Sequence, residues 1–343
     1  MTHPPLVEAR NLSVEFHMRR GLFSRGPAPV VQAVRNMNLS IQRGETLALV
    51  GESGCGKSTL GRAMIRTAPI AHGELIFDGK DITTLAGETL RRARSRFQMI
   101  FQDPYSSLNP KARIFDTLAE PLRVHTSEST AQIRTKVSEM LEAVGLDPTF
   151  AARYPHEFSG GQRQRIAIAR AVIVQPDFIV ADEPLSALDV SMQLQILKLF
   201  DDLRDRFSLT YLFISHDLAR VFSFADRVAV MYLGKLVEIG TAAEITTNPR
   251  HPYTKALLAA APSPDPTIEA DREVPMLSGD IPSPAFPPPG CRFHTRCPIA
   301  MEMCKRIDPE MTHFGNSHMA ACHAAAPGLS HLNTPEPEKD LLP

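Results

Sequence analysis

The chain has 343 residues, of which 43% are hydrophobic and 22% charged, and its formal net charge is −1. This length allows one large domain plus an appendage, and the near-zero charge argues against non-specific nucleic-acid binding as its main work. No run of eighteen apolar residues occurs, and the N-terminal MTHPPLVEARN lacks the features of a secretory signal. We therefore expect the chain to stay in the cytoplasm and to reach a membrane only through a partner.

The first elements are strand-like segments that lead into a glycine-rich loop. Residues 7–18 and 30–50 predict strands, with a turn near Gly44 in the second segment. The apolar run TLALV is followed by GESGCGKST, which has the spacing of a phosphate-binding loop. Its glycines allow a tight turn in which the backbone N–H groups point inward. Lys57 is expected to reach the outer phosphates, and the Ser58 hydroxyl is expected to complete the ligand shell of a magnesium ion. The residues predicted to contact the nucleotide are Gly51, Ser53, Gly54, Cys55, Gly56, Lys57, Ser58 and Thr59, with Cys55 as a small packing residue rather than a reactive thiol.

A mainly helical region is predicted from about 88 to 175, with amphipathic stretches near 113–124 and 130–144. Within it, FSGGQRQRIAIARA begins with Ser159, a natural N-cap, and continues as a helix among arginines. The exposed N–H groups of its first turn make a second candidate anion site. An ordinary capped helix would show the same local pattern.

A second constellation follows in FIVADEP at 178–184. Here an apolar strand ends in Asp182 and Glu183, which are expected beside magnesium and the terminal phosphate. A helix at 190–207, a strand within 209–217 and a hairpin at 231–240 come next. Strand and helix in alternation predict an α/β fold with a mostly parallel sheet.

The order of these motifs resembles the ATP-binding subunits of ABC transporters over roughly residues 6–260. The matching parts are the phosphate loop, Gln102 in FQDP, FSGGQ, the carboxylate strand, SALD at 186–189 and His216 in ISHD. The resemblance implies an ABC-type P-loop ATPase core with an antiparallel β subdomain and a helical subdomain at about 88–175. It also implies that two such subunits pack head to tail, with each ATP between the phosphate loop of one and the signature helix of the other.

Residue roles follow from the resemblance by matching position. Glu183 is the general base, Gln102 senses the metal and the attacking water, and His216 contacts the terminal phosphate. Asp182, Ser58 and Gln102 are the implied residues at the Mg²⁺. Phe16 matches the aromatic that stacks on adenine, although an ordinary aromatic residue of a strand would give the same pattern. The residues implied to act across the dimer are Ser159, Gly160, Gly161 and Gln162, together with Asp189 in the loop that touches the partner.

Beyond residue 260, proline-rich spacers mark a domain boundary, with an extension at 261–330 and a tail at 331–343. The extension holds four clustered cysteines, which in a cytosolic chain favour a metal or cluster site over disulfides. Spacing alone does not choose between zinc and a four-iron cluster. The candidate ligands are Cys291, Cys297, Cys304 and Cys322, with His294, His313, His318 and His323 as possible substitutes.

The extension narrows the resemblance. NPRHPYTKALL, LSGDIPSP and PPPGCRFHTRCP are similar to the C-terminal extension of ATP-binding subunits in the dipeptide and oligopeptide importer branch. Members with this cysteine pattern bind an iron–sulfur cluster, so the resemblance favours [4Fe-4S], with zinc as the alternative. A structural role for the cluster is the default.

The resemblance implies an ATPase that drives peptide import at the cytoplasmic face of a bacterial membrane. Its implied partners are a second, different ATPase subunit, two membrane permease subunits and an extracytoplasmic peptide-binding protein. Importers of this branch also carry nickel chelates, glutathione and other small solutes. A soluble ABC ATPase of DNA repair or ribosomes is the alternative from another class, but the features that mark such proteins are not seen in the sequence.

Overall fold

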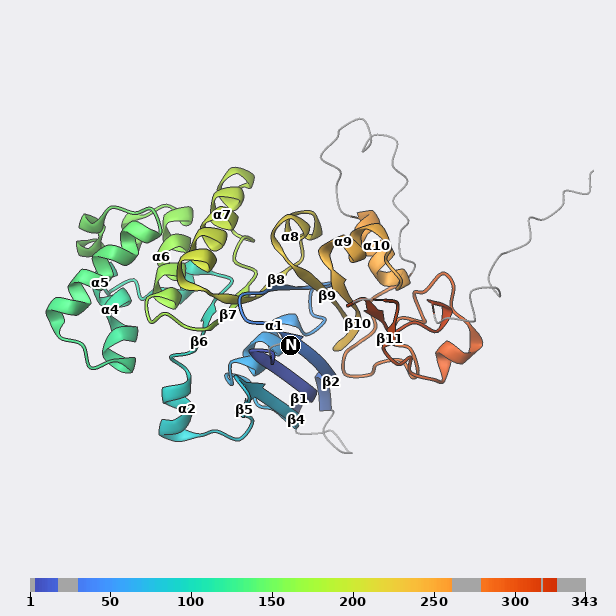
Figure 1. Ribbon diagram of the computed structural model, residues 1–343. Helices are drawn as coiled ribbons and strands as arrows, with labels where there is room; N and C mark the ends of the chain where they lie inside the picture. Colours follow the sequence, from blue (N-terminus) through green and yellow to red (C-terminus); the bar gives the residue numbers. More distant parts are fainter. Residues whose placement is uncertain (1–3, 18–29, 261–278, 316, 326–343) are drawn as a thin grey trace, which may run out of the picture.

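The computed structural model describes residues 4–17, 30–260, 279–315 and 317–325. An eight-stranded sheet crosses this part of the molecule in the order β11-β12-β10-β9-β3-β8-β7-β6 (Figure 1). The strands β6, β7, β8, β3 and β9 run parallel, whereas β10, β12 and β11 join antiparallel. Their bounds are β3 (Thr46–Val50), β6 (Phe97–Ile100), β7 (Phe178–Asp182), β8 (Thr210–Ser215), β9 (Arg227–Tyr232), β10 (Lys235–Thr241), β11 (Thr312–His313) and β12 (Met319–Ala320).

The central strands are buried on both faces. Successive side chains of a strand point to opposite sides, so on β3 Leu47 and Leu49 enter one hydrophobic cluster, whereas Ala48 and Val50 enter the other. Such strands appear in the sequence as continuous apolar runs because neither face meets water. This explains why TLALV and FIVAD carry almost no polar residues.

A smaller antiparallel sheet and α1 (Lys57–Met64) cover one face of the main sheet, and both contribute residues to the same hydrophobic cluster. Helix α1 approaches closely because Gly61 has no side chain. A Cβ there would lie 2.7 Å from Val180 Cγ1 and 2.9 Å from Ile214 Cδ1. The strands of the smaller sheet, in the order β2-β1-β4-β5, are β1 (Val7–His17), β2 (Val30–Ile41), β4 (His72–Phe77) and β5 (Lys80–Asp81).

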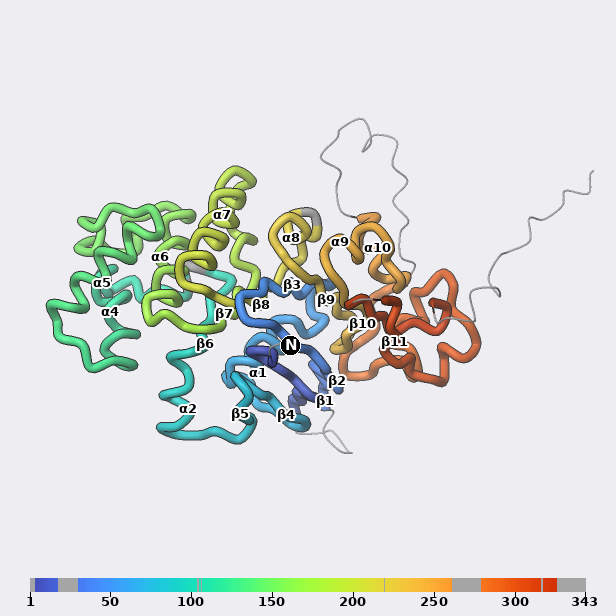
Figure 2. The backbone as a smooth tube through the Cα atoms, viewed as in Figure 1, coloured from blue at the N-terminus to red at the C-terminus, as the bar shows by residue number. Residues whose placement is uncertain are grey.

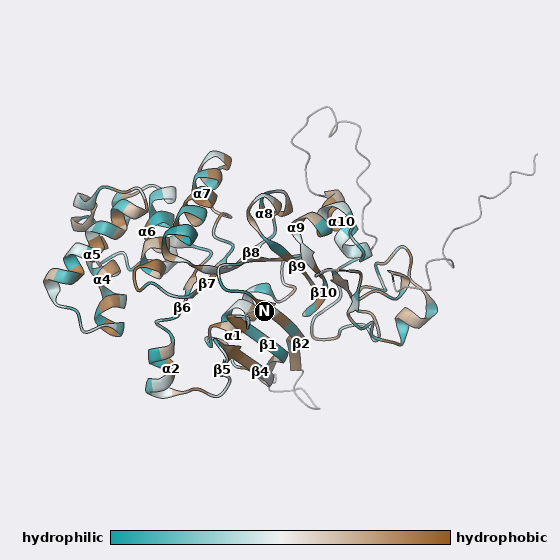
Figure 3. Cartoon of the chain, in the orientation of Figure 1, coloured by the Kyte–Doolittle hydropathy of each residue, from teal (hydrophilic) through white to brown (hydrophobic). Residues whose placement is uncertain are grey.

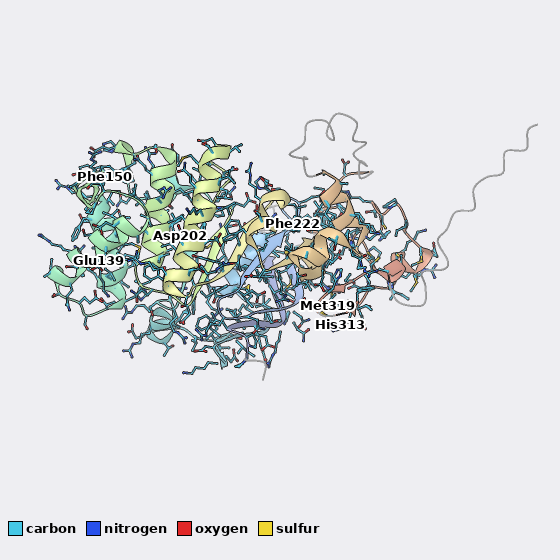
Figure 4. All side chains as sticks on the ribbon, turned by 45° about the horizontal axis from the view of Figure 1, so that its top comes forward. Glu139, Phe150, Asp202, Phe222, His313 and Met319 are labelled. Atoms are coloured by element: carbon cyan, nitrogen blue, oxygen red, sulfur yellow. The ribbon has the colours of Figure 1, made fainter. Side chains whose placement is uncertain are left out.

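Most of the remaining helices form a helical arm and a layer over the other face (Figure 1). In Figure 3 these helices carry both hydrophobic and hydrophilic residues, as expected of helices that are buried on one face only. Glu139 and Phe150 lie within the arm in Figure 4. The bounds are α2 (Gly87–Ala93), α3 (Pro104–Ser107), α4 (Ile114–His125), α5 (Thr130–Ala143), η1 (Pro148–Ala152), η2 (Pro155–Glu157), α6 (Gly160–Val172), α7 (Val190–Phe207), α8 (Leu218–Phe224), α9 (Ala242–Thr247) and α10 (Pro252–Ala260).

The C-terminal region, residues 279–325 as described, follows a winding path with little regular structure (Figure 2). Its elements are η3 (Glu302–Lys305), β11, β12 and η4 (His323–Ala325). His313 and Met319 pair across β11 and β12 and lie side by side in Figure 4. Because β12 pairs with β10, this region extends the main sheet of the cassette.

The predicted α/β class with a mostly parallel sheet is confirmed, and the amphipathic stretches near 113–124 and 130–144 correspond to α4 and α5. Three features were not predicted from the local sequence: strands β4 and β5 lie between the phosphate loop and the helical region, β6 lies inside the region expected to be helical, and two strands of the C-terminal region join the main sheet. The domain boundaries stay a prediction, since residues 261–278 and the predicted tail at 331–343 lie outside the described residues.

Candidate functional site

The phosphate loop links the buried strand β3 to helix α1. Gly56 is the N-cap of α1, with φ +106°, and a Cβ there would overlap the carbonyl oxygen of Ala33. Gly51 has the same constraint against the carbonyl of Met231. Only glycine fits both positions, so the loop can bring its N–H groups to the start of α1, where the helix dipole favours an anion.

The loop residues line one cavity of about 250 Å³. Lys57 is 4% exposed, and its Nζ donates to the carbonyl oxygens of Gly51 at 2.7 Å and Glu52 at 3.1 Å. The ammonium group of Lys57 is therefore held against the phosphate loop by two backbone carbonyls. The cavity is lined by Val31, Gln32, Ala33, Ser53, Gly54, Cys55, Gly56, Lys57, Ser58, Thr59, Gln102, Glu183, Gly234 and Pro284.

The end of β7 carries two carboxylates, of which Glu183 lines this cavity and Asp182 contacts the lining residue Ser58. Ser58 Oγ donates to Asp182 Oδ1 at 2.7 Å, which joins two of the three residues predicted at the magnesium; the third, Gln102, lines the same cavity as Ser58. Asp182 is 2% exposed, and burial raises the pKa of its carboxyl above the ordinary value. Carboxylate and hydroxyl oxygens are the ligands that Mg²⁺ prefers, so the donor set fits that ion.

Glu183 lies at the centre of three predicted catalytic residues. Its Oε2 accepts a hydrogen bond from Gln102 Nε2 at 3.1 Å and lies 3.3 Å from His216 Nδ1. Its φ is +47°, a conformation that non-glycine residues rarely adopt and that is common at functional sites. The backbone N–H of Glu183 donates to Ile214 O at 3.0 Å, which fixes this turn to the neighbouring strand. The structure therefore brings together all three residues that the sequence suggested.

The signature residues lie elsewhere. Ser159 caps α6 in a capping box in which the Gln162 side chain accepts from Ser159 N at 3.1 Å. A Cβ on Gly161 would overlap Met192 Cε, so α6 packs closely against the start of α7. Asp189 caps α7 and accepts from Met192 N at 2.9 Å, and hydrogen bonds from Ser191 and Met192 lower the pKa of its carboxyl. None of these signature residues lines the cavity at the phosphate loop: Ser159, Gly160, Gly161, Gln162 and Asp189 are all absent from its lining. Of the other predicted residues, Gly51, Asp182, His216 and Phe16 are also not among the lining residues.

Of two further residues predicted to contact the nucleotide, Cys55 lines the cavity and is buried, whereas Phe16 is exposed and does not line it. Phe16 is 42% exposed on β1 and pairs across the sheet with Val31, which does line the cavity. Phe16 therefore lies beside the site rather than among its lining residues. Cys55 is 5% exposed, and burial raises the pKa of its thiol, as suits a packing residue.

The four cysteines of the C-terminal region line a single small cavity. Burial, with the neighbouring thiols, raises the pKa of Cys291 and Cys297 to about 11. Among the described residues, no three His, Cys, Asp or Glu side chains form a group that could hold a metal ion. Of the histidines considered as substitutes, His294 and His323 line the cavity, whereas the ring of His318 faces Glu238 Oε1 at 2.7 Å.

Two sequence families match the chain. One, described as ABC transporter, covers residues 34–186, and the other, described as oligopeptide/dipeptide transporter, C-terminal region, covers residues 237–304. The oligopeptide transport ATP-binding protein AppF of Bacillus subtilis is 50% identical over 93% of this chain and 97% of that protein. The oligopeptide transport ATP-binding protein OppF of Haemophilus influenzae is 46% identical over 92% of this chain and 96% of that protein. The chain is an ATP-binding subunit of the oligopeptide/dipeptide ABC transporter family.

Solved structures of ABC cassettes confirm the fold. The dimeric cassette MJ0796 bound to ADP and phosphate has a TM-score of 0.61 and 27% identity, covering 69% of this chain and 98% of that one. CbiO1 of Clostridium perfringens has a TM-score of 0.62 and 26% identity, covering 72% and 92%. The subunit is thus an ATPase that hydrolyses ATP for transport. No helix among its described residues is long and apolar enough to cross a membrane.

Sequence reasoning missed several residues at the ATP site of this subunit. Gly234, from the β9–β10 hairpin, and Pro284, from the C-terminal region, both line the cavity. Glu52 connects the phosphate loop to Arg296 and Tyr253, which lie more than two hundred residues away in the chain. Pro284 ends the segment LSGDIPSP, whose sequence indicates family membership but no contact with the nucleotide site. No local pattern points to Arg296.

Proposed function

We propose that this subunit drives the uptake of oligopeptides, with ATP hydrolysed at a seam between two cassettes. The observation that carries the chemistry is the convergence of Gln102 and His216 on the carboxylate of Glu183. This group lies beside the Ser58–Asp182 pair. Positioning and charge neutralisation supply most of the rate in phosphoryl transfer, and these residues supply both.

Each residue has a defined task in the proposed mechanism. Lys57 and the loop N–H groups bind the phosphates, and Ser58 with Asp182 would hold Mg²⁺, which neutralises charge on the phosphate oxygens when bound. Glu183 accepts a proton from the attacking water, and Gln102 holds its carboxylate in place. His216 lies 3.3 Å from the same carboxylate oxygen, Oε2 of Glu183, and is assigned the contact with the terminal phosphate.

Glu183→Gln tests the general base. Glutamine keeps the size and can keep the contact with Gln102, but it cannot accept the proton of the water. Because a general base contributes about 10²–10⁴-fold, we expect ATP binding to persist and turnover to fall by about a hundredfold or more. Glu139→Gln, on the exposed face of α5, is the control. Unchanged turnover in Glu183→Gln would reject the assignment.

A second cassette completes the proposed site. Ser159 and its glycines make an anion-binding helix start that does not line the nucleotide cavity of its own chain, and the dimeric MJ0796 cassette shows that related cassettes pair. Ser159→Ala in one cassette should slow hydrolysis at the opposite pocket. Ser129, the N-cap of α5 in a capping box of the same kind, gives the matched control Ser129→Ala. Equal effects of the two substitutions would refute a role for Ser159 beyond capping.

We propose an oligopeptide as the solute because the relatives over nearly the whole chain are named as oligopeptide transport proteins and the C-terminal region matches that family. The proposed partners are a different ATPase subunit, two permease subunits and an extracytoplasmic binding protein, at the cytoplasmic face of the membrane. Purification of the tagged subunit from detergent extracts identifies them. A co-purifying binding protein specific for a nickel chelate or glutathione, and not for peptides, would exclude the peptide assignment.

A groove beside α4 is the proposed contact with a permease subunit. A cavity of about 320 Å³ there is lined by residues of α4, β6 and α6, and its apolar side chains Phe101 and Val124 are 40% and 45% exposed. Val124→Asp should abolish transport and leave nucleotide binding by the isolated subunit unchanged. Ile307→Asp, at an exposed position outside the groove, should leave both transport and nucleotide binding unchanged. Normal transport by Val124→Asp would exclude this groove.

The four cysteines are proposed to hold a [4Fe-4S] cluster, with zinc as the alternative. Four thiols around one cavity suit either group. The cluster is placed first because the resemblance of the segment that carries the cysteines favours it. An anaerobic preparation should contain iron and acid-labile sulfide in equal amounts and lose both in Cys297→Ser, whereas Cys55→Ser should keep them. Stoichiometric zinc without iron would overturn the assignment.

A further inference from the structure

The phosphate loop is fastened to the C-terminal half of the chain through one of its residues, Glu52. Its carboxylate accepts two hydrogen bonds from Arg296, Nη1 to Oε2 at 2.8 Å and Nη2 to Oε1 at 3.1 Å. Its backbone N–H donates to the hydroxyl of Tyr253 at 2.8 Å. Its carbonyl oxygen accepts from Lys57 Nζ at 3.1 Å. Glu52 thus joins Arg296 to the lysine that binds phosphate with no intervening residue.

The Arg296–Glu52 pair is shielded from water. The Arg296 side chain is 8% exposed and that of Glu52 22%. A two-bonded guanidinium–carboxylate contact is directional as well as charged, so it fixes orientation in a way that a lysine contact does not. Nη1 of Arg296 also lies 3.5 Å from the hydroxyl of Tyr232.

The pair lies beside a packed aromatic cluster. The rings of Tyr232, Tyr253 and Phe293 pack together with centroids 4.7 to 5.4 Å apart, and Phe293 is 1% exposed. The same segment provides a second link, because Arg292 donates to the carbonyl of Leu233. The neighbouring Gly234 in turn donates to Cys55 O at 2.8 Å. The segment between two of the cysteines therefore supports the phosphate loop at two points.

We propose that Arg296 is a positioning residue for ATP binding, which acts through Glu52 to keep the phosphate loop and Lys57 in their binding arrangement. Arg296 does not itself line the nucleotide cavity. This assigns the C-terminal region a task inside the cassette, in addition to any metal it holds. The proposal rests on the ATPase activity of the family and on neither the solute nor the metal.

The test measures nucleotide affinity directly. The dissociation constant of a fluorescent Mg·ATP analogue is determined for the full-length subunit carrying Glu183→Gln, so that hydrolysis, transport and a partner are not needed. KM and kcat are measured separately in the assembled transporter with Glu183 intact. Failure of the Glu183 assignment would appear as hydrolysis during the first measurement, and failure of this proposal as unchanged affinity.

Arg296→Ala should weaken binding of the analogue and raise KM for ATP by about tenfold, a typical coupling between neighbouring sites, with kcat changed much less. Arg296→Lys, which can supply one of the two bonds, should recover part of the loss. Because Arg296 acts through Glu52, the double variant Arg296→Ala/Glu52→Ala should bind no more weakly than the worse single variant. The control is Lys305→Ala, which breaks an exposed ion pair with Glu302 in the same region.

Affinity within twofold of wild type in Arg296→Ala would overturn the proposal, as would an equal loss in Lys305→Ala or losses that add in the double variant. If Arg296→Ala does not fold, Arg296→Lys decides alone, with a loss of about threefold expected from the missing second bond. Wild-type affinity in that variant would then count against Arg296. Melting temperatures without nucleotide separate a weakened fold from a displaced loop.

Discussion

Replacing Glu238 tests how the C-terminal region is fastened to the cassette. Glu238 lies on β10 and is fully buried. Its carboxylate accepts from the backbone N–H groups of Arg250 at 2.7 Å and His251 at 2.9 Å, and lies 2.7 Å from Nε2 of His318. Three donors from later parts of the chain therefore meet on one side chain, and His318 belongs to the segment that forms β12.

The cost of each substitution follows from the donors it leaves without an acceptor. Glutamine keeps the shape, and its single oxygen can serve one backbone N–H, while its NH₂ group must face the other. One unsatisfied buried donor costs about 1–3 kcal/mol, so we expect Glu238→Gln to lower the free energy of unfolding by about 2 kcal/mol. Leucine leaves three donors unsatisfied and should cost at least about 5 kcal/mol.

Urea denaturation measures these losses, and hydrogen exchange locates them. Protection in residues 312–325 should fall first, because that segment depends on the buried carboxylate. Glu302→Gln, whose side chain is 66% exposed, is the matched control and should change the free energy of unfolding by less than about 0.5 kcal/mol. If Glu238→Leu proved no less stable than Glu238→Gln, the donor count would be the wrong measure and the reasoning would fail.

Three further outcomes are expected. Gly56→Ala should abolish nucleotide binding in an equilibrium assay, because a Cβ there meets the carbonyl of Ala33 and φ is +106°; retained affinity would contradict this. The hydrogen bond from Arg96 lowers the pKa of Asp78, so its stabilisation is present above the ordinary value of 3.8 and is lost as pH falls through the lowered one. Asp78→Asn should therefore cost about 0.5 kcal/mol at pH 7, a small value because the pair is exposed, and nothing in strong acid; a deficit that persists there would refute the assignment. Removing the proposed metal or cluster from the cysteines with a chelator, followed by exchange into chelator-free buffer with Mg²⁺, should raise the dissociation constant of the ATP analogue, because the cysteines flank the segment that carries Arg296; unchanged affinity would separate that metal from the phosphate loop.

The main strands and the phosphate loop were predictable because their signals are local. TLALV is an apolar run of strand length that ends in glycine, and the serine of FSGGQ stands three residues before a glutamine, as a capping box requires. Strand β6 was missed because FQMI, four apolar and polar residues between helical patterns, carries no period that separates strand from helix. Its strand form depends on pairing with β7, which is distant in sequence.

Contacts between distant segments set the limit for the site as well. The sequence supplied Gln102, Glu183 and His216 as separate motif members, but only the fold places their side chains on one carboxylate. Glu52 occupies a position at which the phosphate-loop motif allows any residue, so the motif assigns it no role. Its partner Arg296 is 244 residues away, and no periodicity links two such positions.

The proposed nucleotide site depends on two groups of residues, one in the same subunit and one in the partner cassette. One is internal, because Arg296 and Tyr253 hold Glu52 whether or not a partner is present. The other is external: Ser159 does not line the cavity of its own chain, and the proposed dimer supplies it from a second cassette. A loop held from within can bind nucleotide in a single subunit, while hydrolysis waits for the partner. Loss of Arg296 should therefore weaken binding already in the monomer, whereas loss of Ser159 should leave monomer binding unchanged and slow only the assembled enzyme.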